Sequence, residues 1–365
     1  MRPYVVTVSL LLGLVLLING VAAWDLARHE ARARRLAGEF RPGLAMVFSG
    51  YVDERRLQKV RIAAIPPPRI VAFGSSRIRE LSGAAIDASA GTFYNAGMSA
   101  ASIEDYIAVW ALLRASGKIP DFAIFSLDAW LFNAAHEQVR WLALGDIVTR
   151  FLERNDEGRG VAPVFGDAMY HWYRLKELLS FTVLTTSLAD LERPLTGRRR
   201  LGESVAEALR RDLVPEAEVG GRNAIRADGS VIRAAGRPTI ADLRLTAQRY
   251  VQGGDTHLAG FRWDTQRAHR LEVLWRDMAA QGVRVVAFMA PYHPLAWRLL
   301  HSDPAQAHAI ETTAAFLRDL TARLRVRFLD ASDPGVVPCG EQEFYDAEHA
   351  DPSCLTLVVT RLVRR

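Results

Sequence analysis

The chain has only two cysteines among its 365 residues, Cys339 and Cys354. Two cysteines supply too few ligands for a structural zinc site, so we expect no metal there. They lie 15 residues apart, and a disulfide closing such a loop contributes about 3 kcal/mol in the chain-entropy treatment. A disulfide would also indicate an oxidising compartment, whereas two unpaired buried thiols are the alternative.

Lysine is also scarce, and the net charge is small. Only Lys59, Lys118 and Lys176 are lysines among the 46 basic residues, and the formal net charge is +5. This charge does not predict a nucleic-acid partner. The excess of arginine is typical of genomic composition, and attraction to an anionic polymer or lipid surface is the alternative interpretation.

Internal repeats and long low-complexity segments are absent, which excludes a repeat architecture and a largely disordered chain. Half of the residues are hydrophobic, which is enough for a sizeable core. The length favours one α/β domain with a large insertion.

One long hydrophobic run begins the chain. Residues Tyr4–Trp24 include no charged side chain, and their number is close to the roughly 20 residues that cross a bilayer. We therefore expect residues 1–24 to form a transmembrane anchor with an aromatic residue at each interface. A cleaved signal peptide is the alternative, because Val21-Ala22-Ala23 resembles a small-residue cleavage site. Either segment would direct the rest of the chain out of the cytoplasm.

The arginines around this run favour the opposite orientation. Arg28, Arg32, Arg34 and Arg35 follow the run closely, whereas only Arg2 precedes it. The positive-inside rule would then place the C-terminal side in the cytoplasm. The cysteine pair outweighs this conflict, and we predict a single-pass inner-membrane protein whose globular part lies on the periplasmic side.

We divide the rest of the chain at the proline run Pro66-Pro67-Pro68. Residues 25–68 are expected to form a helical stalk and a connector, because three prolines cannot donate backbone hydrogen bonds and begin a new segment. Residues 69–365 are expected to form the globular domain. Within it, residues 134–262 are predicted to be a mostly helical insertion over the C-terminal edge of a sheet, with helices such as Asp167–Thr185 and Ala241–Val251 and an exposed loop at Leu195–Glu203.

Five short apolar runs predict buried parallel strands. They are Arg69–Phe73, Thr92–Asn95, Phe122–Leu127, Arg284–Met289 and Arg327–Leu329. Helical patterns lie between them, including Ile103–Ala115 and Asp264–Gln281, the second of which ends at a C-capping glycine, Gly282. The alternation of strand and helix predicts a doubly wound parallel sheet.

The first predicted strand ends at Gly74-Ser75-Ser76-Arg77. A glycine-led turn there puts a side chain at the C-terminal edge of the sheet, where open α/β sheets bind ligands. A serine in this place would lie at a helix N-terminus, whose N–H groups can stabilise an oxyanion. The alternative is an ordinary strand–helix turn in which serine caps the helix.

A second motif, Tyr345-Asp346-Ala347-Glu348-His349, lies near the C-terminus between the two cysteines. An aspartate and a histidine three residues apart can share one tight turn, in which the carboxylate binds Nδ1 of the imidazole. Nε2 is then directed toward a serine, and the imidazolium is stabilised. The alternative is a surface turn with two solvated polar side chains.

Together, the two motifs and the strands between them resemble the SGNH/GDSL hydrolase superfamily. Gly74-Ser75-Ser76-Arg77 stands in the place of the family's Gly-Asp-Ser block, so the resemblance implies that Ser76 is the nucleophile. Tyr94-Asn95-Ala96-Gly97 resembles the second block, whose glycine N–H joins that of the serine, here Ser76, in the oxyanion hole. Asp346 and His349 match the final Asp-x-x-His block. The implied fold is a three-layer flavodoxin-like sandwich with five parallel strands.

The third block departs from the family pattern. The family usually has Gly-x-Asn-Asp after the third strand, with the asparagine as an oxyanion donor, but here the strand is followed by Asp128-Ala129-Trp130. Asn133 is displaced, so the third donor is unassigned. Arg77, Asn95, Asp128 and His293 are candidates for the pocket. Arg77 could attract an anionic group or be solvated, Asp128 could be structural or face substrate, and His293 could be structural.

The similarity is closest to membrane-anchored extracytoplasmic members that act in cell-wall and exopolysaccharide acylation. It implies a serine esterase or O-acyltransferase that forms an acyl-serine and needs no cofactor and no metal. The expected partners are an acyl donor, a carbohydrate or envelope-polymer acceptor, the membrane, and proteins of an envelope acylation system. The alternative is a non-catalytic scaffold of the same fold in a polysaccharide assembly complex, which the missing third-block asparagine favours.

Overall fold

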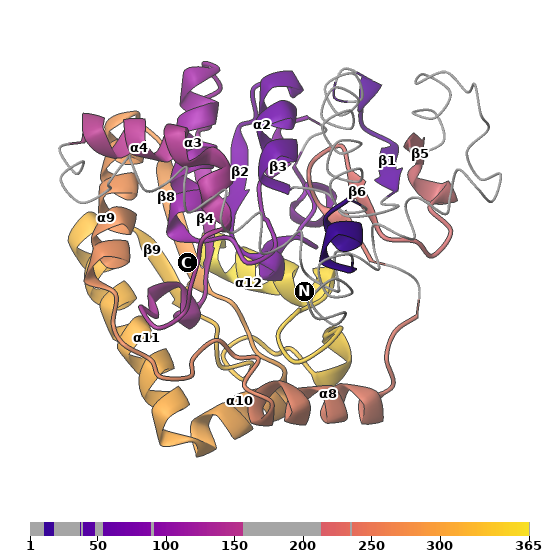
Figure 1. Ribbon diagram of the computed structural model, residues 1–365, viewed down its shortest axis with the longest axis vertical. Helices are drawn as coiled ribbons and strands as arrows, with labels where there is room; N and C mark the ends of the chain where they lie inside the picture. Colours follow the sequence, from indigo (N-terminus) through magenta and orange to yellow (C-terminus); the bar gives the residue numbers. More distant parts are fainter. Residues whose placement is uncertain are drawn as a thin grey trace, which may run out of the picture.

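A five-stranded parallel sheet forms the centre of the computed structural model, which describes residues 11–17, 37, 39–47, 54–88, 91–155, 213–233 and 236–364 (Figure 1). The strand order is β3-β2-β4-β8-β9. The strands are β2 (Ile70–Phe73), β3 (Phe93–Asn95), β4 (Phe122–Leu127), β8 (Arg284–Met289) and β9 (Arg327–Asp330). The predicted α/β class and parallel sheet are confirmed, and each strand boundary agrees with the prediction to within one residue.

The chain winds outward from β2 in two directions, which creates a switch point at the carboxyl edge of the sheet. From β2 it first adds β3 on one side, then crosses over to add β4, β8 and β9 on the other. The loops after β2 and β4 therefore leave the sheet in opposite directions. A crevice at such a point is where open α/β sheets bind ligands.

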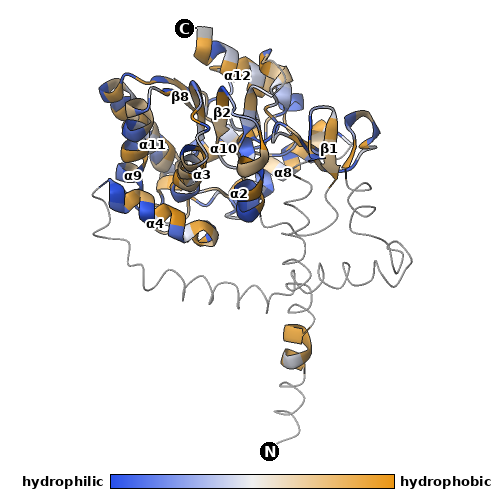
Figure 2. Cartoon of the chain, turned by 90° about the horizontal axis from the view of Figure 1, so that it is seen from above, coloured by the Kyte–Doolittle hydropathy of each residue, from blue (hydrophilic) through white to orange (hydrophobic). Residues whose placement is uncertain are grey.

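Side chains of the sheet alternate between two hydrophobic clusters, because successive residues of a strand point to opposite faces. Val71 and Phe73 pack on one face, under α3 (Ile103–Ala115), α9 (Thr265–Ala280) and α11 (Pro304–Leu324). Ala72 packs on the other, under α12 (Pro352–Arg364). Figure 2 shows the sheet as the middle of three layers, with α12 on one side and α3 and α11 on the other.

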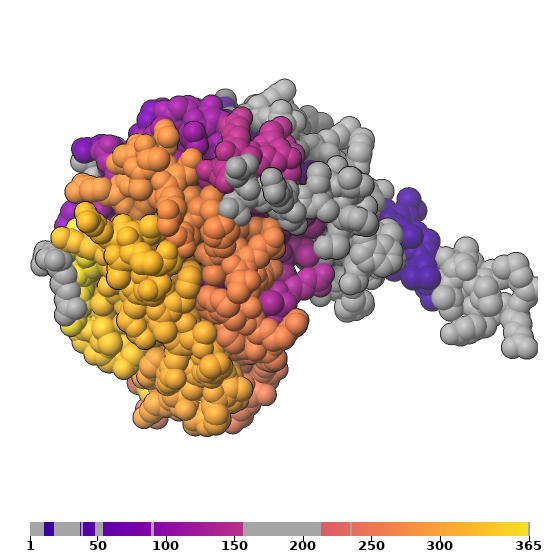
Figure 3. Space-filling model, turned by 90° about the vertical axis from the view of Figure 1, so that its left-hand side faces the viewer, coloured from indigo at the N-terminus to yellow at the C-terminus, as the bar shows by residue number. Residues whose placement is uncertain are grey.

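Capping residues mark the ends of helices α3 and α9. Ser102 and Asp105 form a capping box at the start of α3, and Asp264 accepts the N–H of Arg267 at the start of α9. Gly282 follows α9 with a φ of 79°, which favours glycine. The predicted ranges of α3 and α9 are thus confirmed to within one residue at each end. Figure 3 shows that α9 and α11, in orange to yellow, form one side of the surface.

A second, antiparallel sheet has the order β5-β1-β6-β7 and was not predicted. Its strands are β1 (Leu44–Val47), β5 (Leu213–Pro215), β6 (Ala224–Arg226) and β7 (Val231–Ile232). The first lies in the expected connector, and the others lie in the insertion that we expected to be mostly helical. The sheet pairs β1 with segments more than 160 residues later in the chain, which no local sequence pattern indicates.

The globular domain also begins earlier than predicted, because α2 (Glu54–Ala64) packs on it ahead of the proline run. Arg55 of α2 forms a buried ion pair with Asp105 of α3, with an N–O distance of 2.8 Å. Gln58 of α2 accepts a hydrogen bond from the Tyr94 hydroxyl at the end of the sheet. Helix α2, which precedes the first strand of the parallel sheet, is therefore part of the globular domain.

The described parts of the insertion contain two α-helices, α4 (Gly145–Arg154) and α8 (Ile240–Gln252). The second confirms the helix predicted at Ala241–Val251, and it packs against α10 (Pro294–Ser302). The predicted helix Asp167–Thr185 and loop Leu195–Glu203 lie outside the described residues. Of the predicted span, residues 11–17 are described and are helical. No helix within the described ranges is long and apolar enough to cross a membrane.

Candidate active site

The predicted nucleophile lies on one turn of 3-10 helix, η1 (Ser76–Ile78), immediately after β2. A Cβ at Gly74 would lie 2.7 Å from Cγ2 of Ile78, so only glycine allows this close turn. Ser75 is buried and caps η1, with its Oγ accepting the N–H of Arg77 at 3.3 Å. Ser76 is partly exposed. Of the two serines, Ser76 is therefore the one that a substrate can reach, although the helix expected after it is only a single turn.

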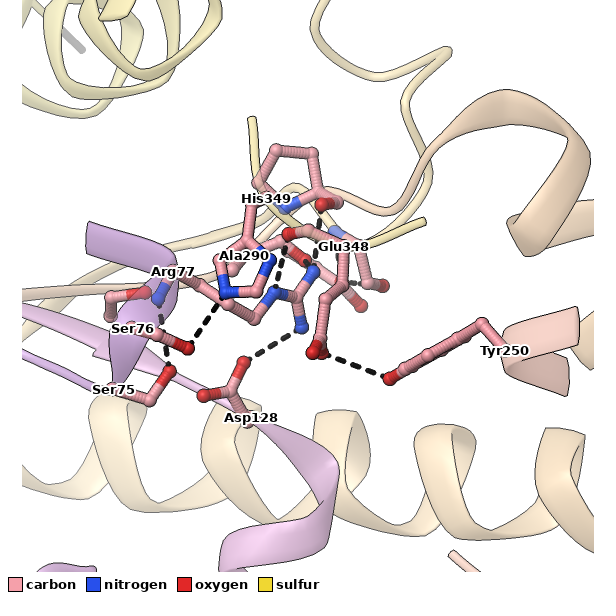
Figure 4. A network of polar contacts seen from close by, with 12 residues as sticks. Ser75, Ser76, Arg77, Asp128, Tyr250, Ala290, Glu348 and His349 are labelled. Carbon is pink, nitrogen blue, oxygen red and sulfur yellow. Dashed lines mark hydrogen bonds and ion pairs between the residues drawn. The ribbon is translucent and has the colours of Figure 1, made fainter. Parts of the chain in front are cut away.

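The structure brings Ser76, His349 and Asp346 together, and Figure 4 shows the His349 ring directed toward Ser76. Nε2 of His349 lies 2.8 Å from Oγ of Ser76, and Nδ1 of His349 lies 2.7 Å from Oδ2 of Asp346. With the proton on Nδ1, Nε2 accepts the hydrogen of the serine hydroxyl. The three side chains thus form a continuous hydrogen-bonded series, the arrangement that can activate a serine hydroxyl.

The electrostatics of the pair favour a charged carboxylate and a basic imidazole. Burial raises the pKa of Asp346, but the His349 hydrogen bond and charge and the N–H groups of Glu348 and His349 lower it further, to well below its usual value. Burial likewise lowers the pKa of His349, but the hydrogen bond and charge of Asp346 outweigh it, so that this pKa is raised above 6.5. Asp346 therefore stays ionised beside a strengthened base.

The turn that carries the base is held at both ends. Cys339 and Cys354 form a disulfide, which confirms the predicted pairing. Within this loop, the Tyr345 N–H donates to the His349 carbonyl at 2.9 Å. Asp346 Oδ1 accepts the N–H groups of Glu348 at 3.0 Å and His349 at 2.8 Å. The aspartate therefore shapes the turn as well as orienting the imidazole.

Arg77 is buried and is neither solvated nor available to an anionic substrate, contrary to both sequence-based interpretations. Its guanidinium pairs with Asp128 at 2.7 Å and also binds main-chain carbonyls, including that of Glu348 at 3.0 Å. Burial alone would lower the pKa of Arg77, but the charge of Asp128, together with smaller contributions from neighbouring acidic groups, outweighs burial and raises this pKa above its usual value. Asp128 is equally buried and faces Arg77 rather than substrate.

The predicted oxyanion donor Gly97 is already hydrogen-bonded inside the protein. Its N–H donates to Oδ1 of Asn95 at 2.9 Å, and Nδ2 of Asn95 donates to the carbonyls of Ile78 and Leu81, both at 2.8 Å. Asn95 is fully buried, so it holds the loop instead of lining a pocket. By contrast, no residue in the described segments accepts the N–H of Ser76.

Two further candidates have structural roles. Nδ1 of His293 accepts the N–H of Leu295 at 3.1 Å and caps α10, while burial lowers the pKa of His293. The main-chain N–H of His293 donates to the Ala347 carbonyl at 3.0 Å and so supports the turn Tyr345–His349, the candidate catalytic turn. The amide of Asn133 donates to the His257 carbonyl at 2.9 Å, away from the triad. The third donor therefore stays unassigned.

The sequence did not predict the contact between the insertion and the catalytic turn. The Tyr250 hydroxyl of α8 donates to Oε2 of Glu348 at 2.9 Å (Figure 4). Arg233 lies over the ring of Tyr345 at 4.8 Å and pairs with Glu80. Glu348 lies inside the Asp-x-x-His motif, which was the only available signal. The insertion thus packs directly on the turn that carries the base.

The described residues contain no group of three or more His, Cys, Asp or Glu side chains that could hold a metal ion. The chemistry that this arrangement can perform is attack by an activated hydroxyl on an acyl carbon. No protein-family model matches the chain, and a sequence search of curated proteins finds no match either.

Proposed function

We propose that the protein is a serine esterase or O-acyltransferase that works through an acyl-Ser76 intermediate. The observation that carries the proposal is the 2.8 Å contact between Oγ of Ser76 and Nε2 of His349. Membership of the SGNH/GDSL superfamily, with its flavodoxin-like sandwich, is part of the same proposal. It is supported by the strand order β3-β2-β4-β8-β9 and by a nucleophile at the switch point of the sheet.

The reaction begins when Oγ of Ser76 attacks the ester carbonyl and its proton moves to Nε2 of His349. Asp346 stabilises the imidazolium that forms. The Ser76 N–H donates to the oxyanion, and Gly97 joins it once its N–H exchanges Asn95 for the ligand. Collapse of the tetrahedral intermediate breaks the ester C–O bond, and the departing alcohol takes the proton from His349. In the second half, the oxygen of water or of a sugar hydroxyl attacks the acyl-serine and gives its proton to His349. The bond between the acyl group and Oγ then breaks, and Oγ of Ser76 takes the proton back.

The proposed setting is the extracytoplasmic face of the inner membrane, with an acylated surface polysaccharide or envelope polymer as substrate. The Cys339–Cys354 disulfide supports an oxidising compartment. The uncharged run Tyr4–Trp24 supports attachment to the membrane. A chain anchored at the bilayer would meet polymers assembled there, together with partner proteins of an acylation system.

Transfer and hydrolysis share the acyl-enzyme and differ only in whether a sugar hydroxyl or water accepts the acyl group. We would incubate the full-length protein in detergent with an activated acyl ester, with and without a soluble oligosaccharide, and analyse the products. We expect Ser76-dependent acyl release in both arms and an acylated oligosaccharide in the second. Free acid alone in both arms would reject the transferase, and no turnover in either arm would count against catalysis.

The alternative function is a non-catalytic scaffold in a polysaccharide assembly complex. The observation that favours it is the internal hydrogen bond of Gly97, which leaves the Ser76 N–H as the one predicted oxyanion donor not engaged by a described residue. A scaffold needs no reactive hydroxyl, so a fluorophosphonate that fails to label the folded wild-type protein would support this alternative.

A further inference from the structure

The side chain of Arg77 joins four segments at the carboxyl edge of the sheet, although nothing in the proposed chemistry uses it. Arg77 itself follows β2, and its ion-pair partner Asp128 follows β4. Nη2 donates to the carbonyls of Ala290 at 2.9 Å and Pro291 at 2.7 Å, directly after β8. Nε donates to the carbonyl of Glu348 at 3.0 Å, in the catalytic turn. One buried side chain therefore ties together three strand ends and the C-terminal motif (Figure 4).

These contacts connect the immediate neighbours of both reacting groups. Arg77 is bonded through the main chain to Ser76, and the carbonyl that it binds belongs to Glu348, which is bonded to His349. A displacement of the guanidinium would therefore shift the nucleophile and the base relative to each other. Their separation of 2.8 Å is the distance on which proton transfer depends.

We propose that Arg77 is a positioning residue, which sets the geometry between Ser76 and His349 by clamping the chain next to each of them. The proposal rests on the proposed function, because positioning matters only if Ser76 and His349 react. Arg77 is 2% exposed, so it touches neither substrate nor solvent and acts through the two residues that it holds.

Arginine suits this task better than lysine. Its planar guanidinium offers five N–H donors in a fixed fork, which satisfies a carboxylate and several carbonyls at once. The ring of Tyr292 lies 4.1 Å from the guanidinium carbon and fixes its plane. A lysine would keep the charge opposite Asp128 but offers a single flexible ammonium, which cannot reach all of the carbonyls in the same geometry.

Asp128 completes the clamp by neutralising a cation that is otherwise surrounded by main-chain carbonyls. Its Oδ1 binds Arg77, whereas Oδ2 is buried and has no hydrogen-bond partner among the described residues. The aspartate that stands in place of the family's asparagine donor therefore serves Arg77. In this chain, that position supports the geometry between nucleophile and base.

The test compares two conservative substitutions in the full-length protein, Arg77→Lys and Arg270→Lys. Arg270 is the matched control, because it forms a buried ion pair with Glu104 at 2.6 Å, between helices α9 and α3 rather than at the catalytic turn. For each variant we would measure the second-order rate of Ser76 labelling by a fluorophosphonate across pH, with the melting temperature as the readout of folding.

We expect Arg77→Lys to label about 100-fold more slowly than wild type, the effect typical of a displacement of about 1 Å in an active site. Its pH midpoint should also shift, because the His349 environment changes. Arg270→Lys should lower the melting temperature but keep the wild-type labelling rate and midpoint. Equal rates and midpoints for folded Arg77→Lys and wild type would overturn the inference, whereas failure of the wild type to label would reject the proposed function instead.

If Arg77→Lys does not fold, the double variant Arg77→Met/Asp128→Leu replaces the buried pair with apolar side chains of similar volume, which proteins often tolerate. It removes the clamp without leaving an unpaired charge. Slow labelling by the folded double variant supports the inference, and labelling at the wild-type rate overturns it.

Discussion

The two halves of the candidate site differ in how ready they are for catalysis. On one side, Ser76, His349 and Asp346 already form a continuous hydrogen-bonded series, with distances of 2.8 and 2.7 Å. On the other side, the N–H of Gly97 points to Asn95 instead of toward a substrate oxygen. The half that would transfer protons is thus preformed, whereas in the half that would stabilise the oxyanion the Gly97 N–H is already bonded to Asn95.

The difference follows from what holds each half. The base lies on a short turn that is closed by a disulfide and shaped by Asp346 itself. The segment Asn95–Gly97, which carries the predicted oxyanion donor, packs against the hairpin between β6 and β7. The Asn95 N–H donates to the Asp228 carbonyl of this hairpin at 2.6 Å. A Cβ at Gly229 would lie 2.1 Å from the Asn95 carbonyl oxygen, so the hairpin packs directly on this loop. The hairpin of the insertion therefore holds the loop that carries Gly97 through direct main-chain contacts.

Removing the Ser76 hydroxyl gives the strongest test of the difference between the preformed series and the Gly97 donor. We expect Ser76→Ala to lower ester hydrolysis by about a million-fold, the loss typical when the serine of a triad is removed. Ser75→Ala should keep turnover, because Ser75 only caps η1 and its loss costs about 1 kcal/mol of stability. Steady-state hydrolysis of an activated ester measures both, and comparable losses in the two variants would contradict the assignment of Ser76.

The next largest effect should come from Asp346→Asn, which keeps the shape of the turn but removes the charge. We expect a loss of about 10,000-fold in kcat, because an amide can stabilise the wrong imidazole tautomer. Glu348→Gln is the control, since Glu348 contacts Tyr250 and not the imidazole nitrogens. Similar kcat values for both variants would show that the preformed half is not what drives the reaction.

A substitution at Gly97 tests the other half of the site, the predicted oxyanion donor. The new Cβ of Gly97→Ala would lie 2.9 Å from Oδ1 of Asn95 and 2.8 Å from Cγ2 of Ile78, so the loop must move. We expect kcat to fall about 100-fold, the usual effect of losing one oxyanion donor. Gly145→Ala on α4 makes only ordinary contacts and serves as the control. An unchanged kcat for Gly97→Ala would show that Gly97 is not an oxyanion donor.

The pH dependence of kcat/KM should report the pKa of His349. His349 must be neutral to accept the proton of Ser76, so kcat/KM should rise with pH and level off above the pKa of His349. Because Asp346 raises that pKa above 6.5, the midpoint should lie above 6.5, with about a tenfold loss per pH unit below it. Asp346→Asn should move the midpoint to lower pH. A midpoint unaffected by this substitution would contradict the coupling between the two residues.

The smallest effect on rate should come from the disulfide. Replacing both Cys339 and Cys354 with alanine should lower the free energy of unfolding by about 3 kcal/mol, because the unfolded chain loses the constraint of a loop of 15 residues. Chemical denaturation measures this change, and a reducing agent should reproduce it in the wild type but not in the variant. An equal stability of all samples would mean that the bond does not support the turn.

The parts that sequence could predict are those with local signals. The strands of the parallel sheet are buried on both faces, so Phe122–Leu127 and Arg284–Met289 read as continuous apolar runs with clear ends. The proximity of Ser76 to His349 was expected from the resemblance of their two motifs, in this order along the chain, to the SGNH/GDSL pattern. The disulfide was predictable because the chain has only one possible pair.

The parts that sequence missed depend on contacts between distant residues. Whether Arg77 is solvated or buried depends on Asp128, Glu348 and the loop after β8, none of which is near it in the chain. The antiparallel sheet pairs β1 with strands of the insertion more than 160 residues later, as Leu44 with Pro215 shows. Likewise, the Gly97 hydrogen bond depends on how Asn95 is held by η1 and the hairpin, which no local pattern encodes.

The central claim is that Ser76 is an activated nucleophile. The most direct measurement is to treat the full-length protein with a fluorophosphonate and to locate the adduct by mass spectrometry in the wild type, Ser76→Ala and Ser75→Ala. We predict a single adduct on the peptide that carries Ser76, which is lost in Ser76→Ala and retained in Ser75→Ala. No adduct on the folded wild type, or an adduct that persists in Ser76→Ala, would contradict the claim.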